Sequence, residues 1–316
     1  MTAAEVPPSE TTRWRAVVRV LRSPLDSLSC TVFPTPCSLC GSLLPRFSLV
    51  PICDLCWTEF PLSDGPVCRR CGDALPAAGA VSLPLQCRPC RMAPPPFVRA
   101  VSYGVYQGRM REAIHALKYD RLHGISDGLG RMLAQAIAQL AGDAPARMLV
   151  VPVPLHATKY AQRGFNQART LASAALRSLR RSHPQWQLTL ASSTLLRQRA
   201  TETQAGLTPR RRRLNVRGAF VVSDPARVVA QHVLIVDDIL TTGATARAAA
   251  QALVEAGAAS VWVATLARAR RAEHFGSSSL HEDLEDQGSP ALASAQPITA
   301  RTARNGSTFE EQPSFD

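Results

Sequence analysis

The segment Val233–Thr245, VLIVDDILTTGAT, restricts the fold of this chain more than any other. It joins an apolar run, two adjacent acids and a Thr/Gly-rich turn, and the residues after it have helical spacing. An unbroken apolar run predicts a strand buried on both faces, and such a strand followed by a helix is typical of a parallel sheet. The segment therefore favours an α/β fold.

Residues 97–266 repeat this alternation of strand and helix. Apolar patterning predicts strands at residues 97–106, 148–153, 232–236 and 260–266, and helices at residues 110–117, 130–140, 167–179 and 245–256. We therefore expect one parallel sheet with helices on both faces.

The two acids and the turn that follows them form the candidate ligand site. At the carboxyl end of a parallel strand, Asp237 and Asp238 would face the crevice where open α/β sheets bind ligands. Backbone N–H groups, hydroxyls and a helix N-terminus after them are suited to a phosphate. The residues that supply these groups are Thr241, Thr242, Gly243, Ala244 and Thr245. The plain alternative is an ordinary strand and helix with capping threonines, and the paired acids favour a ligand site over it.

Eight of the nine cysteines form four CxxC pairs, which predict two zinc ions. The pairs are Cys37/Cys40, Cys53/Cys56, Cys68/Cys71 and Cys87/Cys90, and Cys30 is left over. Two CxxC turns complete the tetrahedral shell of a closed structural zinc site. Consecutive pairing places the first four thiols on one ion and the last four on the other, and spacing alone leaves a cross-braced arrangement open. A disulfide scaffold and a redox-active CxxC are both less favoured, since no secretion signal precedes the pairs.

The charge of the chain is concentrated in its middle. The net charge is +12 overall, and residues 101–271 hold 24 basic and nine acidic residues. A positive field of this kind attracts phosphates, either of a small metabolite or of a nucleic acid. The run Arg210–Arg213 is a candidate contact for a DNA backbone, or else a solvated helix face. Aromatic residues make up only 5 % of the chain, which disfavours a surface that stacks on bases.

Shifts in composition divide the chain into four parts. Residues 1–36 contain a predicted amphipathic helix and a linker, residues 37–92 the double zinc ribbon, residues 97–271 the α/β domain, and residues 272–316 an acidic tail with the composition of disorder. The predicted helix is built on Trp14, Val17, Val18, Leu21 and Leu25. No apolar run is long enough to cross a bilayer and no signal peptide is evident, so we expect a cytoplasmic protein without membrane insertion.

Val233–Thr245 resembles the signature with which type I phosphoribosyltransferases hold phosphoribosyl pyrophosphate (PRPP). Three further features narrow the resemblance: the cysteine pairs, the LKY of Leu117–Tyr119 and the segment PVPLHATKYAQRGFNQARTLA of Pro152–Ala172. In this order they resemble the ComF family of phosphoribosyltransferase-like proteins, which is associated with natural transformation. The resemblance covers roughly residues 25–270.

The resemblance implies a role for each part of the site. Asp237 and Asp238 would bind the ribose hydroxyls as the catalytic acids, and residues 241–245 would wrap the 5′-phosphate. Lys159 and Arg163 are implied pyrophosphate contacts, while Arg199 and Thr201 would belong to a hood over the site. Mg²⁺ would accompany PRPP and bridge its oxygens.

Two functions are compatible with these features. The first is a phosphoribosyltransferase, a pentosyl glycosyltransferase that acts on PRPP and an unidentified acceptor in DNA uptake. The second is a non-catalytic module that senses PRPP or phosphate and binds single-stranded DNA. The family resemblance further implies a helicase-like competence protein as a partner.

Overall fold

The computed structural model describes residues 35–45, 50–63, 65–75, 85–119, 123–199 and 215–270. Its centre is a five-stranded sheet in which every pair of neighbouring strands is parallel. In spatial order the strands are β1 (Ala100–Val105), β7 (Ser260–Arg268), β6 (His232–Leu240), β2 (Arg147–Pro152) and β3 (Gln187–Leu190). The expected parallel α/β fold is therefore confirmed.

Strand β6 differs from its prediction in one respect that matters for the site. It extends to Leu240, so that Asp237 and Asp238 lie within the strand and keep its alternation of faces. The prediction ended this strand at Val236 because the apolar run stops there. Pairing with β7 continues past the acids, with Asp237 opposite Thr265 and Leu240 opposite Arg268, and this carries the strand further.

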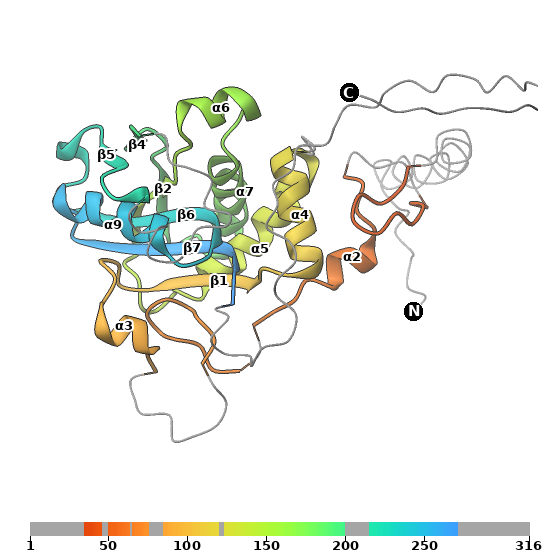
Figure 1. Ribbon diagram of the computed structural model, residues 1–316, viewed down its shortest axis with the longest axis horizontal. Coiled ribbons are helices and arrows are strands. Elements are labelled where there is room, and N and C mark those ends of the chain that lie inside the picture. The colour runs from red at the N-terminus through yellow and green to blue at the C-terminus, as the bar shows by residue number, and fades with distance from the viewer. Residues whose placement is uncertain are drawn as a thin grey trace, which may run out of the picture.

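Successive residues of the central strands face two separate apolar cores, as the pleat requires. Leu234 and Val236 pack in one core with α4 (Gly108–Tyr119), α5 (Ser126–Ala138) and α7 (Gln167–Ser182). Val233 and Ile235 pack in the other with α9 (Ala244–Glu255) and the antiparallel pair of β4 (Leu195–Arg197) and β5 (Phe220–Val222). Figure 1 shows these two layers, with α5 and α7 on one side of the sheet and α9 on the other.

Helices α5 and α7 are the most closely packed pair of helices. A Cβ atom added at Gly130 of α5 would lie 2.2 Å from the Cβ of Ala174 on α7. The absent side chain therefore lets the two backbones approach each other.

The short elements are α2 (Asp54–Thr58), α3 (Arg88–Met92), α6 (Ala157–Arg163) and the two 3₁₀ turns η1 (His123–Ile125) and η2 (Pro225–Arg227).

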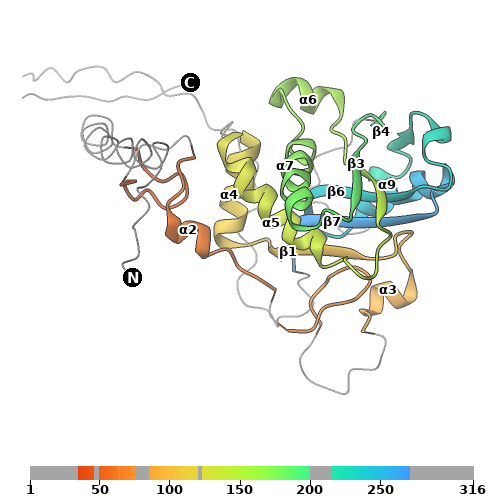
Figure 2. The ribbon, with the colours of Figure 1, turned by 180° about the vertical axis from the view of Figure 1, so that it is seen from behind.

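The two cysteine groups lie on opposite sides of the sheet. Cys37 and Cys56 of the first group belong to the core that contains α4 and α5. All four cysteines of the second group belong to the core that contains α9. In Figures 1 and 2, α2 lies beyond α4 on the side away from the sheet, whereas α3 lies next to β1.

Several predictions concern residues outside the described part of the chain. These are the helix over Trp14–Leu25, Cys30, the acidic tail from residue 272, the hood residue Thr201 and the run Arg210–Arg213. Among the described helices, none combines the length and the hydropathy that a bilayer span needs.

Candidate functional site

The site is centred on two acids in the last part of β6 and a lysine from α4. Lys118 lies in the last turn of α4, and its Nζ is 2.8 Å from Oδ2 of Asp238. Asp238 is buried, with 6 % of its surface exposed. Oδ1 of Asp237 accepts a hydrogen bond of 2.9 Å from the backbone N–H of Asp238. A buried acid is stable only when a cation or several donors compensate it, and Lys118 is that cation.

The two acids differ in their protonation. Burial opposes the ionisation of Asp238, but the charge of Lys118 and its hydrogen bond outweigh burial, and with help from Arg163 they hold the pKa of Asp238 below its usual value. Burial raises the pKa of Asp237 to about 8, and the charge of Asp238 adds to that rise. Without a ligand, the pair therefore holds close to one negative charge at neutral pH. A cationic or hydroxyl-bearing ligand would find one ionised acid and one acid ready to lose its proton.

The turn after β6 presents backbone donors without protein partners. Within the described residues, no acceptor takes the N–H groups of Thr241, Thr242 or Gly243. Gly243 has a φ of 78°, in the left-handed region, and directly precedes the first residue of α9. Ala244 N donates to Oγ1 of Thr242 at 3.4 Å, which turns that hydroxyl toward the start of the helix. Adjacent amides at the positive end of a helix form a site for an anion such as phosphate.

A second loop follows the carboxyl end of β2. Asn166 fixes it, since its Nδ2 donates to the carbonyl of Val153 at 3.0 Å and its Oδ1 caps α7 by accepting from Arg169 N at 3.2 Å. The loop includes α6, which carries Lys159 and Arg163 and ends at Gly164 with a φ of 77°. The charge of Arg163 reaches Asp238 and lowers its pKa. Of the two predicted pyrophosphate contacts, Arg163 is the one with this electrostatic link to the acids.

Arg199 and Arg197, which lie two positions apart in the sequence, make different contacts in the structure. Nη2 of Arg199 donates to the carbonyls of Asn215 at 2.8 Å and Arg217 at 2.9 Å, so its guanidinium joins the two chain segments on either side of residues 200–214. Burial lowers the pKa of Arg197, and the negative charge of Asp237 acts against that shift. The guanidinium carbon of Arg197 lies 5.5 Å from the ring centre of Phe220. Arg197 is therefore the arginine of β4 that is coupled to the acids.

Lys118 and Arg197 are the site residues to which the sequence assigned no firm role. For Lys118 the signal was its place at the end of a predicted helix, within the LKY of Leu117–Tyr119. From there it could reach a phosphate, but a lysine before a tyrosine is more often a surface residue. Arg197 is the last residue of β4 and Arg199 follows it by two positions, and the sequence does not show which of the two is coupled to the acids.

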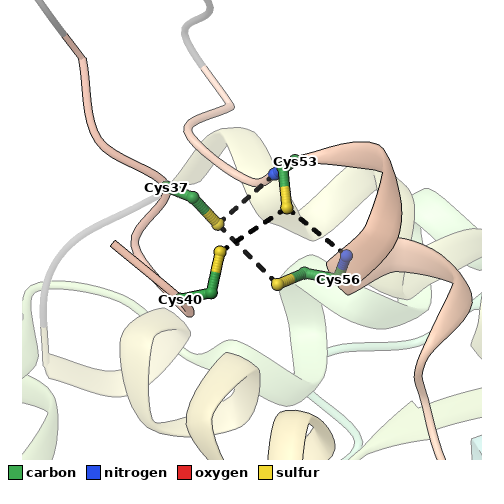
Figure 3. A group of neighbouring side chains, drawn as sticks. All are labelled: Cys37, Cys40, Cys53 and Cys56. Atoms are coloured by element: carbon green, nitrogen blue, oxygen red, sulfur yellow. Dashed lines mark hydrogen bonds between the residues drawn. The ribbon is translucent and has the colours of Figure 1, made fainter. Parts of the chain in front are cut away.

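The first cysteine group has the dimensions of a zinc site. Its four Sγ atoms lie within 4.8 Å of one another, including 3.6 Å between Cys40 and Cys53 and 3.9 Å between Cys37 and Cys56. Figure 3 shows the four thiols turned toward a common centre. Tetrahedral Zn²⁺ with Zn–S bonds of about 2.3 Å requires sulfurs roughly 3.8 Å apart, whereas a disulfide requires about 2.05 Å. The geometry fits zinc and not disulfides.

The second group has the same form and is more deeply buried. Cys68, Cys71, Cys87 and Cys90 are all buried and their Sγ atoms again lie within 4.8 Å of one another. Hydrogen bonds that the Cys90 thiol shares with Cys68 and Cys71 raise the pKa of Cys90, because they favour its protonated form, and burial adds to the rise. Buried thiols that share protons in this way can bind a metal cation, which displaces the protons and compensates the charge of the thiolates. The structure therefore groups consecutive CxxC pairs, the first two pairs together and the last two together. It does not have the cross-braced arrangement, in which alternate pairs would meet.

Comparison with known proteins supports the fold class that the sheet indicates. Residues 161–279 match the phosphoribosyl transferase domain family. The chain is 35 % identical over 219 residues to the DNA utilization protein YhgH of Escherichia coli K12, which covers 69 % of this chain and 90 % of that protein. It is 27 % identical over 207 residues to Competence protein F of Haemophilus influenzae, covering 65 % of this chain and 85 % of that protein.

One solved structure, of the allosteric regulatory enzyme of purine biosynthesis, matches 46 % of this chain and 26 % of its own at 24 % identity and a TM-score of 0.28. The parallel sheet and the matched domain together define a protein of the phosphoribosyltransferase type. Two cysteine groups precede the domain, and close relatives cover most of the chain. The chain belongs to the ComF family of phosphoribosyltransferase-like proteins.

Proposed function

We propose that the protein binds PRPP together with Mg²⁺ at the carboxyl end of β6. The observation that carries this proposal is the order of groups along β6 and the turn after it. Two adjacent acids, one paired with Lys118 at 2.8 Å, are followed directly by backbone amides that have no acceptor among the described residues. The acids suit the ribose hydroxyls and the amides of residues 241–243 suit the 5′-phosphate. The hydroxyls of Thr241, Thr242 and Thr245 complete the phosphate cradle.

The same residues can support transfer of the ribosyl phosphate. Breaking the bond between C1 and pyrophosphate develops positive charge on the ribose ring and negative charge on the leaving group. Asp237 and Asp238 lie where they would stabilise the ring, and Lys159 and Arg163 on α6 would bind the pyrophosphate oxygens. Mg²⁺, when bound, supplies charge that neutralises the pyrophosphate. The acceptor of the ribosyl phosphate has no recognisable pocket among the described residues.

The names of the relatives suggest where this activity is used. The matched proteins are called DNA utilization protein and Competence protein F. We therefore propose that the protein acts in the uptake of DNA. A cytoplasmic location, and single-stranded DNA and a helicase-like protein as partners, belong to the same proposal and are implied by the resemblance of the sequence to the ComF family. The two cysteine groups would each hold one structural zinc, and metal analysis of the purified protein is expected to return about two zinc ions per chain.

Calorimetric titration with PRPP and Mg²⁺ tests the binding site. The wild-type protein is expected to bind saturably, and Asp237→Ala and Asp238→Ala are expected to lose that binding. Asp127→Ala is the matched control, because Asp127 is an exposed acid in an ion pair with Arg177 on the surface. A folded wild-type protein that does not bind PRPP would refute the proposal. Release of pyrophosphate from bound PRPP then separates a transferase from a module that only binds.

A second candidate function, binding of single-stranded DNA without turnover, is favoured by a cationic cavity. This cavity has a volume of about 750 Å³ and lies at the end of β3, where Arg169 and Arg227 line it beside Ser192, Ser193 and Thr194. Guanidinium and hydroxyl groups are the usual contacts of a phosphate backbone. Binding through several phosphates must weaken steeply between low and moderate salt, and a flat response would exclude it.

A further inference from the structure

A buried arginine connects the second cysteine group with the turn after β6. Arg268 is the last residue of β7, and only 3 % of its surface is exposed. Its Nη1 donates to the carbonyl of Leu240 at 2.7 Å and also to the carbonyl of Thr241. Its Nη2 lies 3.4 Å from Oδ1 of Asp73, of which 2 % is exposed. One guanidinium therefore contacts both the start of the proposed phosphate loop and a residue of the cysteine group.

Asp73 is held by the turn that carries the cysteines. It follows Cys71 by two residues, and its carbonyl accepts a hydrogen bond of 2.7 Å from Cys68 N. Gly72 N in turn donates to the carbonyl of Cys68 at 2.8 Å. The position of Asp73 thus depends on the position of the thiols.

The geometry of this contact requires an arginine. A guanidinium has five donors in one plane and keeps its charge at any pH at which the protein is folded, so it can bind two carbonyls and a carboxylate at once. By holding the carbonyls of Leu240 and Thr241, Arg268 fixes the direction of the peptide that leads into the amides of residues 241–243. A shift of Asp73 would shift those amides.

We propose that Arg268 is a positioning residue for the phosphate loop and that the second cysteine group, when it holds its metal, sets the position of Arg268 through Asp73. The inference rests on the proposed binding of PRPP at this loop. Binding of metal and binding of PRPP are then coupled, and each increases the affinity for the other by the same factor. Nothing comparable joins the first cysteine group to the loop among the described residues.

The test compares matched substitutions in the two cysteine groups. Asp73→Asn keeps the shape of the side chain and removes its charge, and Arg268→Lys keeps a charge and removes the planar fork. Each is expected to weaken binding of PRPP with Mg²⁺ by about tenfold, within the usual range of coupling between sites. Asp54→Asn is the control, because Asp54 is exposed and lies beside Cys53 of the first group. It is expected to leave the affinity unchanged.

A second readout uses the metal. The zinc ion of the second cysteine group is expected to be the more slowly lost of the two, because that group is more deeply buried. We expect PRPP with Mg²⁺ to slow the release of this ion to a chelator in the wild type and in Asp54→Asn, but not in Asp73→Asn. If wild type fails to bind PRPP, the proposed function is wrong. If wild type binds and both Asp73→Asn and Arg268→Lys bind equally well, or PRPP does not alter zinc release, the coupling is wrong. Lower melting temperatures with unchanged affinity would make the contact merely structural and would also overturn it.

Discussion

The two cysteine groups have the same ligands and similar spacing, yet they differ in what surrounds them. In the first group Cys40 is exposed and the group contacts helices, with Nη1 of Arg109 on α4 donating to the carbonyl of Leu39 at 2.7 Å. The ring of Trp57 lies so close to α5 that a Cβ atom added at Gly128 would be 2.2 Å from it. The first group therefore packs against helices α4 and α5 on one face of the molecule.

In the second group all four cysteines are buried and the neighbouring backbone is bound to the sheet. Ala100 N of β1 donates to the carbonyl of Arg70 at 2.9 Å, and Nη2 of Arg247 on α9 donates to the carbonyl of Ala93 at 2.9 Å. Asp73 reaches the ligand loop through Arg268. Two groups with the same number and type of ligands can therefore differ in how strongly a bound metal affects the ligand site. What differs between them is the set of elements to which their cysteine turns are hydrogen-bonded.

The largest expected difference comes from removing one ligand of each group. Cys71→Ser is expected to unfold the sheet or to lower its melting temperature by more than about 10 °C, because a structural zinc contributes on the order of 10 kcal/mol to the fold that holds it. Cys40→Ser is expected to lose one zinc while the sheet stays folded. Zinc analysis, thermal unfolding and PRPP titration measure the difference. The comparison fails if Cys71→Ser folds and binds PRPP as wild type does, or if Cys40→Ser loses that binding.

A second prediction concerns how the stability of the sheet depends on pH, which the acids of the ligand site determine. The pKa of Asp237 is raised to about 8 in the folded protein, against about 3.9 in an unfolded chain. The folded state keeps a proton that the unfolded state releases, so the free energy of unfolding falls as pH rises from about 4 to 8, by up to about 1 kcal/mol per pH unit. Asp238, whose pKa is lowered, titrates below this window.

Thermal melts of the ligand-free protein at pH 5 and pH 8, with zinc release recorded in parallel, test this effect. Release of the second zinc is expected to follow the shift of the sheet, since all four cysteines of that group are buried in a core of the sheet. Release of the first zinc is expected to follow it less closely, since only Cys37 and Cys56 of that group are buried in the other core. Asp237→Asn is expected to remove the pH dependence. Equal stability of the wild type at both pH values would contradict the raised pKa.

The smallest expected difference comes from the glycines after the second cysteine of each group. Gly41 and Gly72 have φ values of 74° and 67°, so alanine costs about 1 kcal/mol of backbone strain at either position. A Cβ atom at Gly41 would meet nothing within 4 Å, but at Gly72 it would lie 3.2 Å from the carbonyl oxygen of Ala100 on β1. Gly72→Ala is therefore expected to cost about 1 kcal/mol more in urea unfolding. Equal losses would show that the second group is not packed against β1.

The local parts of the molecule were predictable from the sequence. Apolar runs located β1, β2, β6 and β7, and the CxxC spacing located both cysteine groups. Strand β3 was not predicted, because its four residues, QLTL, are partly exposed and form no apolar run. The extension of β6 through its acids depends on pairing with β7, which the sequence of β6 alone does not contain.

The contacts that connect distant residues were not predictable. Lys118 pairs with Asp238 across 120 positions of the chain, and Arg268 pairs with Asp73 across 195 positions. Asp73, Asp238 and Arg268 are buried and Lys118 is half-buried, whereas sequence patterns predict exposure for charged residues. Arg197 and Arg199 show the same limit. They lie two positions apart in the sequence, and only the folded structure shows that Arg197 is coupled to Asp237 whereas Arg199 binds backbone carbonyls.

Hydrogen exchange with and without PRPP and Mg²⁺ is the most direct test that PRPP binds at the end of β6, because it reports where the ligand binds. We expect slower exchange of backbone amides in residues 237–247, which begin with the paired acids, and in the loop of residues 153–166. We expect a smaller effect in residues 68–75, transmitted through Asp73. Exchange that is unchanged in residues 237–247 at saturating PRPP, or slowed only elsewhere, would contradict the assignment of the site.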